Sequence, residues 1–268
     1  MARWLRIVVP VGVAVALGLA CWRLDLRGIG DVLAGASFVP FALAIALNLV
    51  PRTAARARRT QLLLGGRVGF RDVLRLNLAG YAAGQLLPGP AEEVVCSTQL
   101  ARRNGFAWRE VLSFQAIDKA LGAISVAALA LVLLPPLVGA AIAVTAVVAL
   151  ALGARRLLAP LGWLMVSNVV CLAIIALCIA AVGGEVPPGG CVQICLATSL
   201  ASIIPFVPGQ VGTLESAFVM TGMHLGLAAP VALAAAVLFH LAMLAPAAIA
   251  GVPLLVRLRW EKPEIKPC

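Results

Sequence analysis

The stretch that decides the fold is Gly84–Val95, GQLLPGPAEEVV. It places a Pro-Gly-Pro break and two adjacent carboxylates, Glu92 and Glu93, inside a very apolar chain. Proline removes a backbone donor and glycine frees the backbone dihedrals, so a helix ends at such a break. A second stretch, Ile203–Glu215, IIPFVPGQVGTLE, has the same character. The sequence therefore predicts two interrupted helices, each with acids beside the interruption.

The composition is that of an integral membrane protein. Hydrophobic residues make up 62% of the 268 residues and charged residues 12%, and the mean hydropathy is +1.05. Soluble domains have about 45–50% apolar and about 25% charged residues. The apolar runs are long and unbroken, unlike the short alternating segments of a membrane barrel. We predict an all-α integral membrane protein that forms a single polytopic domain over residues 1–268.

The net charge and the cysteines exclude several classes of function. The formal net charge is +10, but the basic residues lie between apolar segments, where they set topology, so we expect no nucleic-acid partner. The seven cysteines contain no CxxC pair, which argues against a metal site or a disulfide framework. No nucleotide-binding loop, zinc motif or nucleophile elbow is present in the sequence. We expect no cofactor, no metal, no catalytic residue and no enzymatic activity.

The apolar runs predict six full spans and two re-entrant hairpins. Each span has about the length that a bilayer requires, and the six are 4–22, 36–51, 111–134, 137–153, 160–182 and 229–256. The first run has a basic start like that of a signal peptide, but its length and the spans that follow favour a retained helix. Two further stretches, about 73–101 and 191–224, are divided at their centres by the Pro-Gly breaks. Each half is too short to cross alone, which predicts hairpins that enter and leave on the same side.

The basic residues indicate the orientation. With six spans and two hairpins, all of them except Arg23, Arg27 and Lys119 fall on one side, as the positive-inside rule favours. This predicts a bacterial inner (cytoplasmic) membrane protein with both termini in the cytoplasm. The segment Arg52–Arg75 is read as a long cytoplasmic loop (52–72) that either fixes topology or binds an anionic lipid surface. Two pairs of full spans in place of the hairpins would leave the same sides unchanged, and that alternative stays open.

The two broken stretches also indicate an internal repeat. Pro88-Gly89 of the first break recurs 120 residues later as Pro208-Gly209. Three predicted spans lie between the breaks, and an odd number of crossings inverts the second copy relative to the first. We therefore expect inverted pseudo-repeats at about 73–134 and 191–256, an arrangement typical of transporters. The alternative is that proline and glycine recur by chance in an apolar sequence.

The breaks predict a binding site near the middle of the membrane. Non-helical backbone at that depth is tolerated only where it is buried in protein or lines a wet cavity. The helices that begin at about 90–93 and 210–213 offer free N–H groups that favour negative charge, such as a phosphate head group whose lipid tails stay in the bilayer. The predicted head-group site comprises the break residues and nearby ionisable side chains: Gln85, Pro88, Gly89, Glu92, Glu93, Asp118, Lys119, Pro208, Gly209, Gln210, Gly212, Glu215 and His240.

The ionisable residues have alternative roles. Glu92, Glu93 and Glu215 either cap their helices or pair with cations, bind substrate amines or accept protons. Lys119 either extends to the cytoplasmic interface or supplies a cation for a lipid phosphate or for Glu93. His240 follows Lys119 by 121 residues and is either a packing residue or a functional counterpart of it.

These motifs resemble the flippase-like transmembrane domain of lysylphosphatidylglycerol synthetases. The resemblance extends from about residue 40 onward and is carried by LNLAGYAAGQLLPGPAEEVV and IIPFVPGQVGTLESAF. The family pattern resembles L-P-G-R-x-G-E; here Pro90 and Glu92 replace its basic residue and its second glycine, and Glu93 matches its acid. Lys119 and His240 stand where arginines would be expected. No aminoacyl-transferase domain is visible in the 268 residues, so the resemblance implies a protein that moves a lipid and does not synthesise one.

The leading hypothesis is an inner-membrane lipid transporter of the flippase-like kind. It would move a lipid with a polar or phosphorylated head group, either a phospholipid or a polyprenyl (isoprenoid) lipid, between leaflets by relative motion of two inverted halves. The alternative is a membrane enzyme, or an enzyme subunit, that acts on a polyprenyl-linked glycolipid. A third possibility is a scaffold that recruits a pathway enzyme as partner.

Overall fold

The structure is a computed structural model that describes residues 26–87, 90–131, 133, 154–202 and 208–260. Every regular element in these residues is a helix, which confirms the all-α prediction for this part of the chain. In order, the elements are α2 (Leu26–Ala34), α3 (Phe38–Leu47), η1 (Asn48–Arg52), α4 (Thr53–Leu63), α5 (Phe70–Leu86), α6 (Ala91–Arg103), α7 (Trp108–Leu131), η2 (Arg155–Leu157), α9 (Leu158–Ala181), α10 (Gly190–Ala201), η3 (Pro208–Gln210), α11 (Thr213–His224), α12 (Ala229–Pro246), η4 (Ala247–Gly251) and α13 (Val252–Trp260).

Several helices are long and apolar enough to cross a membrane. Within the described residues they are Phe38–Leu63, Trp108–Leu131, Arg155–Ala181 and Ala229–Arg257. They correspond to four of the six predicted spans. The other two predicted spans, 4–22 and 137–153, lie outside the described residues. The chain is therefore a multi-pass membrane protein by helix length and hydropathy.

The predicted loop at 52–72 is wrong for most of its length. The helix that begins at Phe38 continues through Pro51 and ends at Leu63. A short π-helical turn, η1, contains Pro51, and this wider register accommodates a residue that cannot donate a backbone hydrogen bond. The polar residues after Pro51 lower the hydropathy and so suggest a loop. They lie on a helix because several of them face partners inside the protein.

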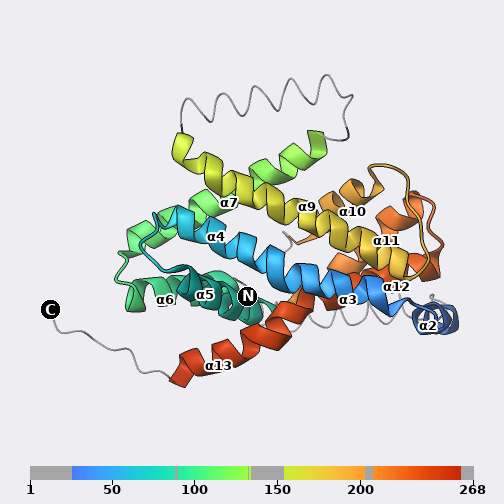
Figure 1. The fold of residues 1–268 in the computed structure, drawn as a ribbon, viewed down its shortest axis with the longest axis horizontal. Helices are drawn as coiled ribbons and strands as arrows, with labels where there is room; N and C mark the ends of the chain where they lie inside the picture. The colour runs from blue at the N-terminus through green and yellow to red at the C-terminus, as the bar shows by residue number, and fades with distance from the viewer. Residues whose placement is uncertain (1–25, 88–89, 132, 134–153, 203–207, 261–268) are drawn as a thin grey trace, which may run out of the picture.

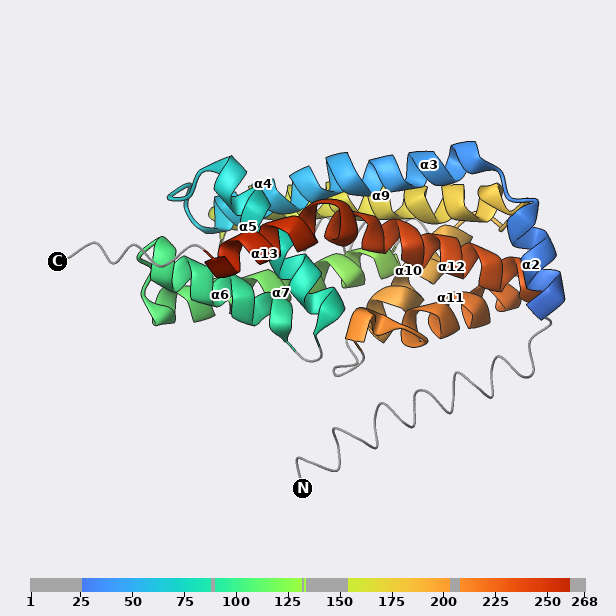
Figure 2. The same ribbon diagram turned by 90° about the horizontal axis from the view of Figure 1, so that it is seen from below.

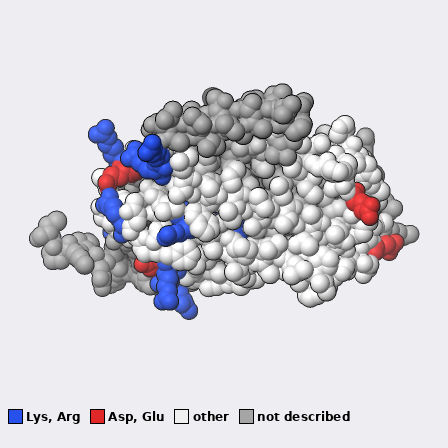
Figure 3. All heavy atoms as spheres, turned by 45° about the horizontal axis from the view of Figure 1, so that its top comes forward, with Lys and Arg blue, Asp and Glu red and all other residues white. Residues whose placement is uncertain are grey.

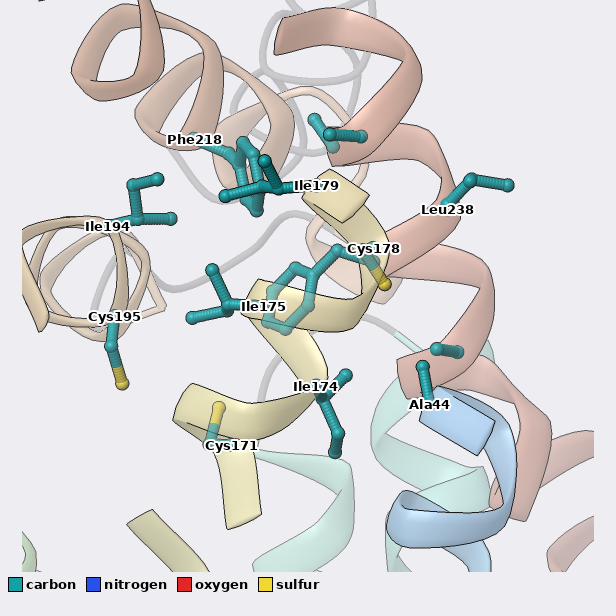
Figure 4. Close-up of a cluster of buried hydrophobic side chains, with 14 of the residues drawn as sticks. Ala44, Cys171, Ile174, Ile175, Cys178, Ile179, Ile194, Cys195, Phe218 and Leu238 are labelled. Atoms are coloured by element: carbon teal, nitrogen blue, oxygen red, sulfur yellow. The ribbon is translucent and has the colours of Figure 1, made fainter. Parts of the chain in front are cut away.

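The core forms around α9, which lies antiparallel to the continuous helix α3–α4 (Figure 1). The two helices meet at their ends, where the Ser37 N–H donates to the Ala181 carbonyl oxygen over 2.7 Å. Figure 4 shows Ile175 of α9 in a cluster with Phe218 of α11 and Leu238 of α12. Since lipid offers no hydrophobic gain over such contacts, close packing is what holds these helices together.

Each broken stretch forms a helical hairpin, and the two hairpins meet. Helix α5 packs on α6, and α10 packs on α11. Figure 2 shows the pairs approaching from opposite ends of the molecule, with the end of α5 and the start of α11 near its middle. At the meeting point Gly209 of η3 lies against the end of α5, because a Cβ at Gly209 would be 3.3 Å from the Gln85 carbonyl oxygen. The two breaks are thus neighbours in space although they are distant in sequence.

Glycines allow α5 to lie close to its neighbours on two sides. A Cβ on Gly80 would be 2.5 Å from the Cys96 sulfur, and one on Gly84 would be 3.2 Å from the Glu92 Cβ. On another side of α5, a Cβ on Gly251 of η4 would be 2.5 Å from a carbonyl oxygen of α5. Small residues let membrane helices approach closely enough for backbone contact. Helix α5 is therefore held between α6 and the end of the last long helix.

Charged side chains lie mainly at the two ends of the molecule. On the face that Figure 3 shows, lysines and arginines gather at one end with some acidic side chains among them, the charged side chains at the other end are acidic, and most of the surface between the ends is uncharged. The basic end is the one at which α4 ends and α7 begins (Figure 1). The asymmetry that the positive-inside rule uses is therefore present on the folded surface as well as in the sequence.

The close contact of Gly251 with α5 predicts that Gly251→Ala destabilises the protein. The added methyl group would overlap a backbone carbonyl oxygen, which cannot move aside as a side chain can. Overpacking of this kind costs about 1–3 kcal/mol. Thermal unfolding of the detergent-solubilised protein measures the loss as a lower Tm.

Gly122→Ala in α7 is the matched control, because a Cβ at Gly122 has no atom within 4 Å. Alanine has a higher helix propensity than glycine, so the Tm should be unchanged or raised. Equal Tm values for the two variants would show that α5 and η4 are not in backbone contact.

Candidate functional site

The second helix of each hairpin begins with acids. Helix α6 has Glu92 and Glu93 in its first turn, and α11 has Glu215 in its first turn. Unpaired N–H groups and the helix dipole make a helix start favourable for negative charge. Pro88 and Gly89 of the first break lie outside the described residues, whereas Pro208 and Gly209 of the second form part of η3.

The first hairpin is joined to α7 by an ion pair. The Lys119 Nζ lies 2.5 Å from the Glu93 Oε1. The backbone oxygen of Glu93 also accepts hydrogen bonds from Ser97 Oγ at 2.6 Å and from Gln115 Nε2 at 3.0 Å. Lys119 therefore pairs with Glu93, as one of its predicted roles requires, while its side chain is 69% exposed, which is compatible with the other role, extension to the interface. These contacts fix the start of α6 against the middle of α7.

The second hairpin is joined to α12 in a similar way. The Glu215 Oε1 lies 2.5 Å from His240 Nδ1, and the two side chains are 19% and 7% exposed. The other oxygen, Oε2, accepts the Gly212 N–H at 2.7 Å. Glu215 thus caps its helix and pairs with a potential cation at the same time. The Gly212 N–H, predicted to be available to a head group, already has an acceptor.

The two acid–cation pairs occupy matching places. Glu93 and Lys119 are 26 residues apart, and Glu215 and His240 are 25 residues apart. Each pair joins the second helix of a hairpin to the long helix that follows it. The pairs differ in chemistry, because Lys119 contributes an ammonium group and His240 an imidazole ring.

Arginines of α4 contribute further ion pairs that the sequence analysis missed. The Arg56 Nη2 lies 2.7 Å from the Glu92 Oε1, and its guanidinium lies 4.9 Å from the centre of the Tyr81 ring. The Arg59 Nη2 lies 2.9 Å from the Asp118 Oδ1. These contacts bring α4, α5, α6 and α7 together around one charged cluster.

A spacing signal could have revealed these arginines. Arg52, Arg56 and Arg59 are four and three residues apart, which places them on one face of a helix. A row of cations on one face needs carboxylates opposite it when that face is directed into a membrane protein. If the segment is interpreted as a loop, the arginines face water and need no carboxylates opposite them, so the ion pairs are not predicted.

Arg52 begins this row and lies at the junction of α3–α4 with α12. Its Nη1 donates to Asn48 Oδ1 at 3.2 Å and to the Met243 sulfur at 2.6 Å. Asn48 Nδ2 donates to the Ala242 carbonyl oxygen at 2.8 Å, and Tyr81 Oη donates to the Met243 carbonyl oxygen at 3.0 Å. Asn48 and Tyr81 therefore provide hydrogen-bond donors for backbone carbonyl oxygens near the end of α12.

The structure brings the predicted site residues together in two groups. One group lies around the start of α6 and contains Glu92, Glu93, Asp118 and Lys119. The other lies around the second break, where Gly212 and Glu215 contact each other and Glu215 contacts His240. Gln85 and Gly209 form the contact between the hairpins, and the backbone oxygen of Gln210 accepts the Thr213 hydroxyl at 2.9 Å.

The pair between Arg59 and Asp118 should contribute strongly to stability. These side chains are 14% and 24% exposed, so Arg59→Gln would leave a mostly buried carboxylate without its cation. A loss of about 2–4 kcal/mol is expected in unfolding measurements in detergent. The double variant Arg59→Gln, Asp118→Asn should regain much of that loss, because no charge is then left alone.

Arg67→Gln is the matched control, since Arg67 and Glu110 form a pair whose side chains are 51% and 49% exposed. Such surface pairs contribute at most about 1 kcal/mol. A loss as large as that of Arg59→Gln would contradict the difference in burial.

Comparison with known proteins gives one match. The sequence profile described as the lysylphosphatidylglycerol synthase TM region matches residues 4–157 and 150–251. No curated protein matches the chain, and no solved structure does. The profile matches cover both hairpins, both acid–cation pairs and most of the length of the chain. The chain therefore belongs to the family of the lysylphosphatidylglycerol synthase TM region.

Proposed function

We propose that this protein moves a lipid with a polar or phosphorylated head group between the two leaflets of a bacterial inner membrane. The observation that carries the proposal is the meeting of the two hairpins at Gln85 and Gly209, from opposite ends of the molecule. Secondary transporters build their substrate sites from broken helices of inverted repeats that meet near the bilayer midplane. Membership in a family named after a lipid synthase favours a lipid as the substrate.

The order and spacing of the helices support an inverted repeat. A long helix, a hairpin and a second long helix occur as α3–α4, α5, α6 and α7, and again as α9, α10, α11 and α12. Helix α7 begins at Trp108 and α12 begins at Ala229, 121 residues later. The acids of the two acid–cation pairs, Glu93 and Glu215, are 122 residues apart, and the cations, Lys119 and His240, are 121 residues apart. The expected pseudo-repeats at 73–134 and 191–256 then each gain a preceding helix, α3–α4 or α9.

The lengths of the hairpin helices support re-entrant segments in preference to pairs of full spans. Helix α6 has 13 residues and α11 has 12. At about 1.5 Å per residue these helices are roughly 18–20 Å long, whereas the hydrocarbon core is about 30 Å thick. Each hairpin would therefore reach the middle of the bilayer and return to the side from which it came.

The ion pairs give the proposed transport a physical mechanism. Each pair fastens a hairpin to the following long helix, and paired charges cost less in a membrane than isolated ones. A lipid phosphate would compete for Lys119, and a lipid amine would compete for Glu93. Exchange of these partners would loosen a hairpin and permit relative motion of the two halves. The head group would pass along charged side chains while the tails stayed in the bilayer.

The opposite directions of the hairpins can be tested by labelling single cysteines. Asn104→Cys, after α6, and His224→Cys, at the end of α11, are both at exposed positions in the structure. In a variant whose native cysteines are replaced by alanine, a membrane-impermeant maleimide should label His224→Cys in intact cells. Asn104→Cys should react only after the membrane is opened. Labelling of both positions from one side would contradict an inverted repeat.

Transport itself can be tested in vesicles of phosphatidylcholine that contain a trace of fluorescent phosphatidic acid in one leaflet. The wild-type protein should speed redistribution of the probe, and Glu93→Gln with Glu215→Gln should slow it at least about tenfold, a barrier change of ~1.4 kcal/mol. Glu110→Gln is the control, because Glu110 is half exposed and pairs with Arg67. No redistribution by the wild type, or the same rate for the double variant, would refute the proposal.

A further inference from the structure

Among the residues that the structure describes, Arg52 has no carboxylate partner. It lies near the middle of the helix Phe38–Leu63 and its side chain is half-buried. Both of its hydrogen bonds leave from Nη1 and go to uncharged acceptors, the Asn48 Oδ1 and the Met243 sulfur. Its Nε is buried and has no acceptor in the described part of the chain.

The acids of the described residues do not compensate this charge. Among the described residues, the carboxylates at the hairpins and in α7 already have cations of their own: Arg56 for Glu92, Lys119 for Glu93, Arg59 for Asp118, His240 for Glu215 and Arg67 for Glu110. Asp72 lies beside Arg75, and Asp31 and Glu185 are exposed. Of the segments outside the described residues, the internal ones, 88–89, 132, 134–153 and 203–207, contain no aspartate or glutamate, and the terminal ones, 1–25 and 261–268, contain Asp25, Glu261 and Glu264.

The position of Arg52 places the excess charge between the two halves. Its hydrogen-bond acceptors come from the first long helix and from α12. Tyr81 of α5 donates to the backbone of the same residue, Met243, that faces Arg52. A ligand that neutralised Arg52 would therefore contact elements that the proposed transport moves relative to one another.

We propose that Arg52 binds a phosphoryl group at this junction. The inference rests on the proposed function and names the part of the protein that receives the phosphate of the cargo. A guanidinium keeps its charge at all physiological pH values, and its fork of N–H groups fits two phosphate oxygens at once. Because Nε is closed off in this conformation, the anion binds when the helices around Arg52 separate. A phosphate therefore favours a more open arrangement of the halves.

The hairpin tips are less suited to phosphate than Arg52. Glu92 and Glu93 bring negative charge to the start of α6, and Glu215 does so at the start of α11. Glu215 also accepts the Gly212 N–H that a phosphate would need. The uncompensated positive charge is that of Arg52, on the helix Phe38–Leu63, and it binds the anionic part of the head group.

A counter-ion supplied from within the protein tests this inference. Met243→Glu places a carboxylate where the sulfur now accepts from Arg52, and Met243→Gln, similar in size and uncharged, is its control. Native mass spectrometry of the full chain in detergent would measure binding of dioleoyl phosphatidic acid and of dioleoylglycerol. Met243→Glu should weaken binding of phosphatidic acid at least tenfold, while Met243→Gln should retain it. Neither variant should change the binding of dioleoylglycerol.

Arginine variants on the same helix provide an independent test. Arg52→Gln should also weaken binding of phosphatidic acid at least tenfold, and Arg52→Lys should restore part of it by restoring the charge. Arg58→Gln is the control, because Arg58 is exposed and bonds only to Gln61 in the described structure. Wild-type binding of phosphatidic acid in Met243→Glu and in Arg52→Gln would overturn the inference.

Two further measurements distinguish a free phosphate from a lipid phosphate, and failure of this inference from failure of the proposed transport. If millimolar inorganic phosphate competes with phosphatidic acid in the wild type but not in Arg52→Gln, the site also binds a free anion. If inorganic phosphate does not compete, the site is restricted to lipid phosphate. Both results support a phosphoryl site. Binding of phosphatidic acid that depends on Arg52, with no redistribution between leaflets, would refute transport and keep the anion site. Redistribution at the wild-type rate in Arg52→Gln would refute the site as part of transport while transport remained.

Discussion

A carboxylate held away from water needs a cation beside it, because an isolated charge in a membrane protein is costly. In this protein the acids that start α6 and α11 have such cations, and none of those cations lies on the same helix. Glu92 is paired with a residue of α4, Glu93 with one of α7 and Glu215 with one of α12. Charge compensation therefore joins each hairpin to the helices beside it, and apolar packing around α9 supports that arrangement.

Backbone contact is the second requirement of the fold, and it comes from glycine. The glycines of α5 and η4 let one hairpin helix lie against two neighbours at distances that a methyl group would prevent. Gly209, with a positive φ of 61°, makes the turn that touches the end of α5.

The two halves share a helix order but differ in charge. The first half contributes Arg52, Arg56, Arg59 and Lys119, whereas the described contacts of the second half include one acid–cation pair, between Glu215 and His240. Asn48 illustrates the difference: it bonds to the backbone of α12, while Asn168, 120 residues later, has a buried Nδ2 without a partner in the described structure. Three of these four cations are paired with carboxylates, so Arg52 is the charge of this set that a head group would find uncompensated.

The sequence by itself determined the membrane class, the all-helical fold and the positions of the two breaks, because hydropathy, proline and glycine act on the chain locally. It also marked the acids at the breaks and the match between Lys119 and His240. The tertiary structure alone decided that residues 53–63 form a helix, that Arg56 and Arg59 face acids 36 and 59 residues away, and that Gln85 meets Gly209. The spacing of the arginines could indicate that they need acids opposite them, but which acids they meet depends on how separate helices pack against one another.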